Sequence, residues 1–356
     1  MNNQYSKLAM LGWTDWFEKR IEPAPGEGSI ARVMAVDREV LLVINQDGIF
    51  RAKLAGRYHY QHVLAQDFPS VGDWVRIEKQ PTDDFGIIQA LIERKTVLRR
   101  KSAGESVEYQ MIAANLDWAI IVQSCHFDFN VNRLERYLVM VRDGGVEPCI
   151  LLTKTDLITP ETLADQLAEI EAVGITAPVM TLSNVTREGI DALYSALQPA
   201  KTYCFVGSSG VGKSTIINNL MGRAQLHTGD ISGSGEGRHT TVRRELLILE
   251  SGALVIDNPG MREFAVLGAE NGIDTSFSDI IQRTSSCRYR NCSHTGEPGC
   301  AVIEALRSGD LNQERYDNYR KLKEESEYYQ MSYAEKRKKD RDFGKFIKSV
   351  KKHSKG

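Results

Sequence analysis

The sequence contains no long hydrophobic run. No stretch of its 356 residues approaches the roughly 18 consecutive apolar residues that a membrane-spanning helix needs. Its N-terminal segment, MNNQYSKLAMLGWTDWFEKR, also lacks a basic flank followed by an apolar core and a small-residue cleavage site, which is the pattern of an export signal. We therefore expect a cytoplasmic protein with no membrane partner.

Cysteine is scarce, and its distribution argues against a disulfide framework. The chain has six cysteines, of which Cys125, Cys149 and Cys204 stand singly in apolar, strand-like runs that suit buried thiols. The other three crowd around one histidine. Clustering of that kind indicates a metal site rather than oxidation.

The net charge is small, -2, but it is unevenly distributed. Residues 336–356 carry ten Lys and Arg against two Asp, a net of +8, which leaves 35 basic and 45 acidic side chains, a net of -10, on residues 1–335. A basic tail is attracted to polyanions such as RNA, and it is equally typical of a solvated, disordered end. Composition alone leaves both alternatives open.

Two patterns divide the chain into domains. Five short β-branched segments between residues 28 and 93, separated by turn signals, predict a small OB-like β-barrel. From residue 118 onward strand-like and helical segments alternate, which predicts a parallel sheet with flanking helices. The expected fold class is therefore multi-domain α/β. Its expected parts are an N-terminal extension, the barrel, a nucleotide-binding domain, a helical zinc-binding domain and the basic tail, at residues 1–27, 28–100, 101–270, 271–335 and 336–356.

A phosphate-binding loop lies well inside the chain. GSSGVGKS at residues 207–214 matches G-x-x-x-x-G-K-[ST], between the strand-like KTYCFV and the helical STIINNLM. In such a loop the backbone N–H groups surround a diphosphate, Lys213 reaches the β and γ oxygens, and the Ser214 hydroxyl holds Mg²⁺. The expected nucleotide contacts from this loop are Gly207, Ser208, Ser209, Gly210, Val211, Gly212, Lys213, Ser214 and Thr215.

The segment DNPG, at residues 257–260, follows the apolar run ALVI. Asp257 is thus expected at a strand end, where a carboxylate orients Mg²⁺ through water, and Gly260 offers its N–H to the γ-phosphate. A D-x-x-G sequence alone is a common turn. Its spacing from the phosphate loop favours the functional interpretation.

Two segments upstream of the phosphate loop indicate guanine. TKTD at residues 153–156 places Asp156 where its carboxylate accepts N1–H and N2–H₂ of guanine, a pairing that adenine cannot make, with the Lys154 stem along the ring. Thr153 stands where Asn is more usual, which alters a hydrogen bond that braces the loop. Ser183 and Asn184 end the next predicted strand and offer backbone N–H groups to guanine O6.

The order of these segments is unusual. The base-reading segments precede the phosphate loop and DNPG, whereas ordinary GTPases have the opposite order. Joining the usual domain ends and cutting between DNPG and TKTD yields this order without disturbing the sheet, because domain termini commonly lie close together. The sequence therefore predicts a circularly permuted P-loop GTPase domain.

A Gly- and Ser-rich segment, GDISGSGEGRHTTVRREL, connects the phosphate loop to DNPG. We expect Thr241 to coordinate Mg²⁺ when GTP orders this segment, with Thr240 as the alternative. Met261 stands where many GTPases place a water-orienting Gln, so intrinsic hydrolysis is expected to be slow. His239 is a candidate for orienting water, and an exposed histidine without that role is the alternative.

Cys287, Cys292, His294 and Cys300 lie within 14 residues, in CRYRNCSHTGEPGC. Three thiolates and one imidazole satisfy tetrahedral Zn²⁺ with no open position, which predicts one structural zinc. Binding would fold a short segment that has no core of its own.

Taken together, TKTD, GSSGVGKST, GRHTT, DNPGMREF and CRYRNCSHTGEPGCAV, behind a small β-barrel, resemble the bacterial ribosome small subunit-dependent GTPase A family. The resemblance covers roughly residues 28–330. It implies an OB domain, a permuted GTPase domain and a zinc domain acting in late maturation of the 30S subunit, with GTP hydrolysis stimulated by the ribosomal particle. The implied partners are GTP and GDP, the 30S subunit and its 16S rRNA, and we expect a monomer.

Carried over by motif, Lys213 and Ser214 match the phosphate and Mg²⁺ residues of that family, and Asp257 and Gly260 match its γ-phosphate sensor. The residues that read guanine in that family correspond to Lys154 and Asp156, and its water-positioning histidine corresponds to His239. Its zinc ligands correspond to Cys287, Cys292, His294 and Cys300. Departures are Thr153, Asn184 and HTTV where a third threonine is common. The N-terminal segment is less basic than a ribosome-binding extension is expected to be, which favours a divergent paralogue.

Two other functions compete with a ribosome-assembly GTPase. One is an RNA-binding scaffold that holds GTP with little turnover, which Met261 leaves open. The other is an ATP-dependent small-molecule kinase, which predicts no base selectivity and is disfavoured by TKTD.

Overall fold

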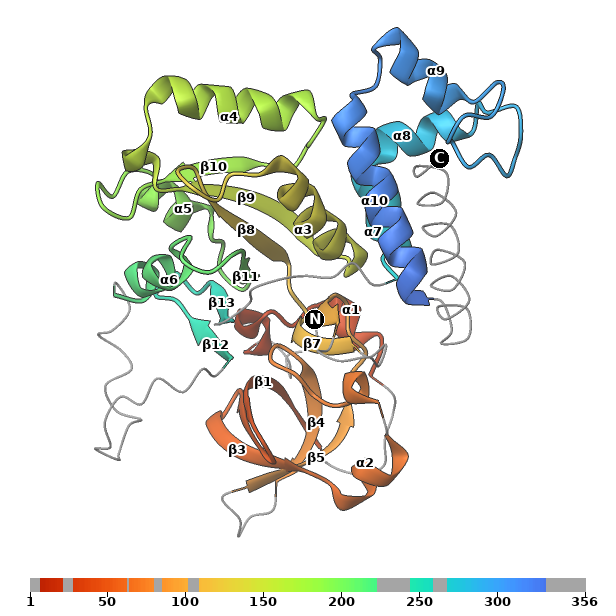
Figure 1. The fold of residues 1–356 in the computed structure, drawn as a ribbon. Coiled ribbons are helices and arrows are strands. Elements are labelled where there is room, and N and C mark those ends of the chain that lie inside the picture. Colours follow the sequence, from red (N-terminus) through yellow and green to blue (C-terminus); the bar gives the residue numbers. More distant parts are fainter. Residues whose placement is uncertain are drawn as a thin grey trace, which may run out of the picture.

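The computed structural model describes residues 7–21, 28–62, 64–79, 85–101, 109–222, 244–258 and 268–330. Its N-terminal strands form a five-stranded barrel of order β1-β2-β3-β5-β4, which β4 closes by pairing back with β1 (Figure 1). Only β3 and β5 pair in parallel. The expected OB-like barrel is confirmed. Its strands are β1 (Ser29–Asp37), β2 (Val40–Asn45), β3 (Gly48–Leu54), β4 (Trp74–Lys79) and β5 (Phe85–Leu91).

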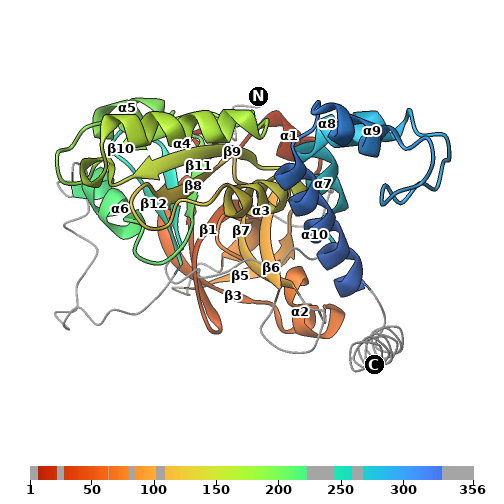
Figure 2. The same ribbon diagram turned by 45° about the horizontal axis from the view of Figure 1, so that its top comes forward.

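The expected parallel sheet follows the barrel, with strand order β10-β9-β8-β11-β13 and β12 antiparallel at one edge. Its strands are near-continuous apolar runs, as is typical of strands buried on both faces. One face carries α3 and α4 and the other carries α5 and α6 (Figures 1 and 2). The strands are β8 (Trp118–Ser124), β9 (Glu147–Thr153), β10 (Val179–Leu182), β11 (Thr202–Val206), β12 (Glu245–Ile248) and β13 (Leu254–Asp257), and the helices are α3 (Val131–Asp143), α4 (Pro160–Ala172), α5 (Ile190–Ala196) and α6 (Lys213–Gly222).

Barrel and sheet are joined by backbone pairing between β1 and β12, at Ala35 and Glu245. A second connection is the hairpin of β6 (Val97–Lys101) and β7 (Tyr109–Ala114), which the sequence pattern does not predict. The fully buried Arg32 of β1 crosses this junction, since its guanidinium donates to the carbonyl of Asn115 at 3.0 Å. Burial lowers the pKa of Arg32 to about 10.

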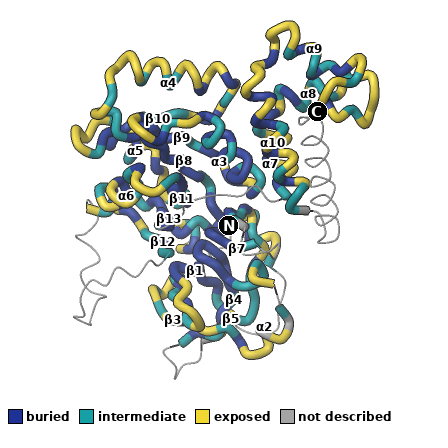
Figure 3. The backbone as a smooth tube through the Cα atoms, viewed as in Figure 1, coloured by how far each residue is buried: buried dark blue, intermediate teal, exposed yellow. Residues whose placement is uncertain are grey.

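The C-terminal region packs α7 (Glu270–Ser276), α8 (Ser278–Thr284), α9 (Ala301–Ser308) and α10 (Gln313–Gln330) beside α3 (Figure 1). Gly309, with φ of 81°, ends α9 in the left-handed conformation that glycine adopts without strain. The apolar cluster under α3 and α4 continues into these helices, so burial extends from the sheet into the C-terminal region (Figure 3).

The N-terminal segment packs against the barrel, which no sequence pattern had suggested. Trp13 and Phe17, the latter in α1 (Asp15–Glu18), are buried against Trp74 of β4, and the rings of Trp13 and Trp74 meet edge to face at 4.8 Å. Elsewhere in the described part are the short helices η2 (Leu8–Leu11), α2 (Gly56–Gln61), η3 (Ala65–Asp67) and η4 (Thr155–Leu157). No helix in the described ranges has the length and apolar character needed to cross a membrane.

Candidate nucleotide and metal sites

The segments singled out for nucleotide binding meet at one edge of the parallel sheet. β9, β10, β11 and β13 all run in the same direction, so the residues at their carboxyl ends share that edge. Leu182 pairs with Thr153, and Thr153 pairs with Ser124 of β8, which places the two base-reading segments side by side. The sheet thus brings together segments whose order in the chain is reversed.

The phosphate loop follows β11 and is shaped by three glycines with positive φ: Gly207 at 143°, Gly210 at 81° and Gly212 at 101°. A Cβ atom on Gly207 would lie 2.1 Å from the carbonyl oxygen of Val122 on β8. Only glycine fits there, because the loop backbone runs directly against the neighbouring strand.

Lys213 begins α6, and its ammonium folds over the loop. Its Nζ donates to the carbonyl oxygens of Gly207 at 2.8 Å and Ser208 at 2.5 Å. Burial lowers the pKa of Lys213, while the carboxylates of Asp128 and Asp257 oppose that shift. Ser214 and Thr215 follow in the first turn of α6, where free backbone N–H groups and the helix dipole favour an anion.

Thr153 braces the phosphate loop. Its side chain is fully buried, and its Oγ1 lies 2.6 Å from the carbonyl oxygen of Val211 and 3.3 Å from that of Gln123. The sequence had suggested that replacing the usual Asn alters this hydrogen bond. A hydroxyl supplies the contact here, so a direct link between TKTD and the loop is present.

Asp156 and Ser183, from the two base-reading segments, contact each other. The Ser183 hydroxyl donates to Oδ1 of Asp156 at 2.5 Å and accepts from the backbone N–H groups of Val185 and Thr186, both at 3.1 Å. The exposed carboxylate of Asp156 is therefore oriented by the β10–α5 loop. Asn184 lies beside the phosphate loop, with its Nδ2 2.9 Å from where a Cβ of Gly212 would be.

Lys154 has the left-handed backbone conformation, with φ of 60°. Its Nζ lies 4.4 Å from the ring centroid of Phe127, a cation–π contact. Phe127 is 58% exposed and was not identified from the sequence. The β8–α3 loop thus contacts the TKTD segment.

Asp257 ends β13, as its apolar run predicted. Burial raises the pKa of Asp257, and the backbone N–H of Asn258 and the charge of Lys213 oppose that shift. The side chain of Asn258 is buried and accepts at Oδ1 from Nε of Arg244 at 2.9 Å, and Arg244 also donates to the carbonyl of Met111 on β7 at 2.7 Å. The sequence does not predict the contacts of Arg244 with Asn258 and Met111, because they join three segments that are distant in the chain.

The Ser214 hydroxyl and the Asp257 carboxylate are hard oxygen ligands of the kind that Mg²⁺ prefers, and a cation would compensate the partly buried charge of Asp257. His239, Thr240 and Thr241 lie outside the described residues, as do Gly260, Met261 and the basic tail. Their roles remain predictions.

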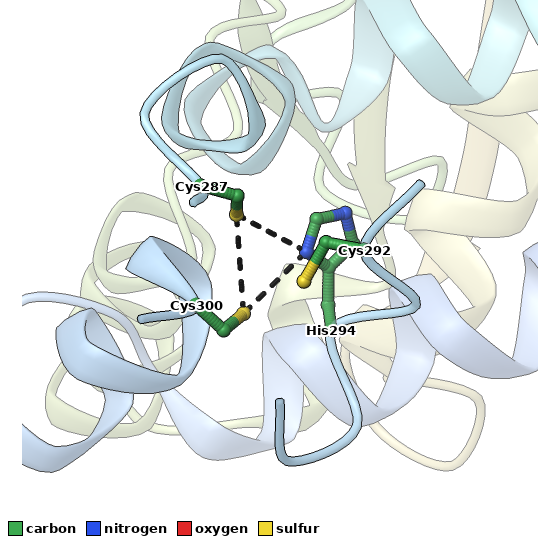
Figure 4. Close-up of side chains that lie close together, drawn as sticks. All are labelled: Cys287, Cys292, His294 and Cys300. Carbon is green, nitrogen blue, oxygen red and sulfur yellow. Dashed lines mark hydrogen bonds between the residues drawn. The ribbon is translucent and has the colours of Figure 1, made fainter. Parts of the chain in front are cut away.

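The four predicted zinc ligands converge on one point (Figure 4). Their ligand atoms all lie within 4.8 Å of one another. The thiols of Cys287 and Cys300 are 4.0 Å apart, and each lies 3.5 Å from Nδ1 of His294. Tetrahedral zinc requires S···S and S···N separations of about 3.8 and 3.6 Å, from bond lengths of roughly 2.3 and 2.05 Å. The residues present therefore fit a four-coordinate zinc.

Surrounding hydrogen bonds hold the metal-binding loop. His294 has φ of 61°, and its carbonyl accepts from the Tyr316 hydroxyl of α10. The carboxylate of Glu297 accepts from the hydroxyl and backbone N–H of Ser293 and from the backbone N–H of Thr295, and these bonds hold the pKa of Glu297 far below its usual range. In many metal sites, hydrogen bonds of this kind orient the residues that bind the metal.

Comparison with known proteins gives concordant matches. A family model described as RsgA GTPase matches residues 91–267. The small ribosomal subunit biogenesis GTPase RsgA 1 of Listeria innocua is 40% identical over 326 residues, 90% of each chain. Proteins of the same name from Listeria monocytogenes and Bacteroides thetaiotaomicron are 42% identical over 323 residues, 90% of each chain, and 36% identical over 355 residues, 99% of each chain.

Two solved structures share the fold. The crystal structure of YjeQ from Thermotoga maritima has a TM-score of 0.63 at 25% identity, covering 83% of this chain and 97% of that one. YloQ, described as a circularly permuted GTPase, has a TM-score of 0.62 at 25% identity, covering 88% of this chain and all of the other, 100%. The expected fold class and the family resemblance are both confirmed.

Proposed function

This chain belongs to the RsgA GTPase family, and from that premise we propose that it hydrolyses GTP to GDP and phosphate during biogenesis of the small ribosomal subunit. The observation that carries the proposal is the meeting of TKTD, the β10–α5 loop and the phosphate loop at one edge of the sheet. Their hydrogen bonds to one another, Ser183 to Asp156 and Thr153 to Val211, support a single preorganised guanine-nucleotide site.

Each segment has a separate task in recognition. The Asp156 carboxylate, held by Ser183, pairs with N1–H and N2–H₂ of guanine. The Lys154 stem packs along the base. The backbone N–H groups of residues 207–215, at the N-terminus of α6, bind the α- and β-phosphates, and Lys213 exchanges its loop carbonyl contacts for phosphate oxygens.

Hydrolysis requires more than binding. Ser214, Asp257 and Thr241 would hold Mg²⁺, which when bound supplies positive charge at the phosphate oxygens. Gly260 donates its N–H to the γ-phosphate. His239 positions the attacking water, because Met261 stands where many GTPases have the Gln that does so. Because Met261 offers no amide to orient the attacking water, we expect turnover to be slow until a partner positions His239.

The partner that we propose is the immature 30S subunit and its 16S rRNA. The curated relatives are named as small ribosomal subunit biogenesis GTPases, which supports this assignment. The OB-like barrel and the zinc-bearing helices lie on two sides of the GTPase sheet, so both are available to the particle (Figure 1). We propose that the protein acts in the cytoplasm as a monomer.

The test is GTP hydrolysis by the purified protein alone and with 30S, 50S and 70S particles, together with His239→Ala. Strong stimulation by 30S particles only, lost in the variant while GTP still binds, is the expected result. No stimulation by any particle would overturn the proposal and favour an RNA-binding scaffold that holds GTP with little turnover.

A further inference from the structure

The loop between β8 and α3, residues 125–130, matches no nucleotide-binding motif, yet it runs beside the phosphate loop. Phe127 approaches within 4.0 Å of where a Cβ of Gly210 would be, and Asp128 lies close enough to Lys213 for its charge to act on that ammonium. Asp128 is 8% exposed, and its Oδ2 has no hydrogen-bond partner within the described ranges. A buried carboxylate at this position requires a cation beside it.

Arg133, in the first turn of α3, supplies that cation and also contacts the phosphate loop. Its Nη1 donates to Oδ1 of Asp128 and, at 3.1 Å, to the hydroxyl of Ser208. Ser208 is the second residue of GSSGVGKS and offers its own carbonyl to Lys213. One guanidinium nitrogen thus connects α3 to the loop that carries the phosphates.

The position of Arg133 is fixed by its surroundings. Asn130 caps α3, with its side chain accepting from the backbone N–H of Arg133 at 2.8 Å. The Gln123 amide at the end of β8 clamps the backbone of Asn130 from both sides, donating to its carbonyl and accepting from its N–H, each at 3.1 Å. The first turn of α3 is therefore attached to the sheet edge that carries the nucleotide site.

The same turn of α3 is attached to the C-terminal region. Glu135 is 2% exposed and accepts at Oε1 from Nη1 of Arg315 on α10, at 2.6 Å. Arg315 in turn binds both oxygens of Asp279 on α8, at 2.6 and 2.9 Å. One residue further along α3, Arg136 pairs with Glu325 at 2.7 Å.

Helix α3 also touches α7 at the backbone. A Cβ on Gly272 of α7 would lie 2.0 Å from the carbonyl oxygen of Val139, so the two helices are in direct main-chain contact. Close-packed interiors have low compressibility and transmit strain, so the packing of α3 offers a route between the nucleotide edge and the C-terminal helices.

We propose that Arg133 is a positioning residue of the nucleotide site, which sets the phosphate loop through Ser208 and links that loop, through α3, to the C-terminal helices. The proposal rests on the guanine-nucleotide binding proposed above. It differs from a helix-end ion pair without a contact to the loop, whose loss has no consequence for the ligand.

The first test is a double-mutant cycle of Arg133→Ala and Ser208→Ala, read as the dissociation rate of a fluorescent GDP analogue. Each single variant is expected to release GDP about 5–10-fold faster. The double variant should release it no faster than Arg133→Ala, because Ser208→Ala removes only a contact that Arg133→Ala already lacks. Arg133→Lys keeps the charge but not the fixed donor geometry, so it should recover only part of the effect.

Arg142→Ala is the matched control. Arg142 lies on α3 about 14 Å further along by helix rise, so its loss tests general destabilisation of the helix. Unchanged GDP release is expected. An equal acceleration in this control, additive single effects in the cycle, or unchanged release in Arg133→Ala would each overturn the proposal.

The second test measures the link to the C-terminal helices by amide hydrogen exchange of residues 313–330, with and without saturating GDP. Wild type should show a nucleotide-dependent change in α10, and Arg133→Ala should lose it even when saturated. An identical change in both proteins contradicts the link. Failure of wild type to bind GDP would instead refute the proposed function.

Discussion

The nucleotide site and the metal site are built in opposite ways. The nucleotide site draws on segments between residues 123 and 258, which meet only because parallel strands end at the same edge. The metal site takes its four ligands from 14 consecutive residues in a loop with little apolar content. The difference teaches that the first depends on the fold, and we expect the second to depend on its ion.

Removing the metal should have the largest effect. Cys300→Ser is expected to abolish binding of one zinc per chain and to expose the amides of α9, because Cys300 precedes that helix and is buried in the apolar cluster. The parallel sheet should persist and GDP should still bind. Metal analysis measures the bound zinc, hydrogen exchange measures the exposure of α9, and titration measures GDP binding.

Cys149→Ser, which changes a half-buried thiol on β9, is the control and should retain the zinc. If the amides of α9 stayed protected in zinc-free Cys300→Ser, the loop would not depend on its ion and the comparison would fail.

Gly207→Ala should come next. The new methyl group would lie 2.1 Å from the Val122 carbonyl at a φ of 143°, so the loop must move away from β8. We expect loss of nucleotide binding and about 3 kcal/mol of unfolding free energy, from the steric clash together with backbone strain. Urea unfolding and GDP titration are the measurements.

Gly222→Ala, at the end of α6, is the matched control, since no atom lies within 4 Å of the added group. It should be neutral. Normal GDP affinity in Gly207→Ala would show that the loop does not need its close approach to the sheet.

Removing the Thr153 hydroxyl should have the smallest of these effects. Thr153→Val keeps the side-chain shape but leaves the Val211 carbonyl without its donor, which costs roughly 1–3 kcal/mol. GDP release should accelerate about tenfold. Thr153→Ser retains the hydroxyl and should accelerate release less than Thr153→Val; the reverse order would argue against a hydrogen-bonded brace.

Most of the fold could be predicted from sequence because its signals are local. The short β-branched segments of β1–β5 and the apolar runs of β8, β9 and β11 follow from side-chain burial on one or both faces. The β6–β7 hairpin was missed because charged residues at 99–101 disguise it. The packing of Trp13 on Trp74 depends on tertiary contact alone.

The candidate sites show the same difference between local sequence signals and tertiary contacts. Motif residues such as Lys213, Asp257 and the four residues of the cysteine–histidine cluster could be singled out from the sequence, because a short spacing carries their expected chemistry. Arg133 and Arg244 were not, because their partners lie 75 and 133 residues away in sequence and no periodicity relates them. Phe127 likewise stands in no motif, and its contacts with Lys154 and with the phosphate loop at Gly210 reveal it.

The central claim is that base-reading segments located before the phosphate loop act together with it to select guanine. Its most direct measurement is equilibrium binding of GDP, XDP and ADP to wild type and Asp156→Asn. Asp165→Asn, a carboxylate exposed on α4, serves as the control. Wild type and control should prefer GDP over ADP by about 100-fold or more, the yield of two hydrogen bonds to a charged group.

Asp156→Asn should lose about 100-fold in GDP affinity and gain affinity for XDP, because xanthine carries a carbonyl where guanine carries its amino group and an amide can donate to it. Equal binding of ADP and GDP by wild type, or unchanged GDP affinity in Asp156→Asn, would contradict the account.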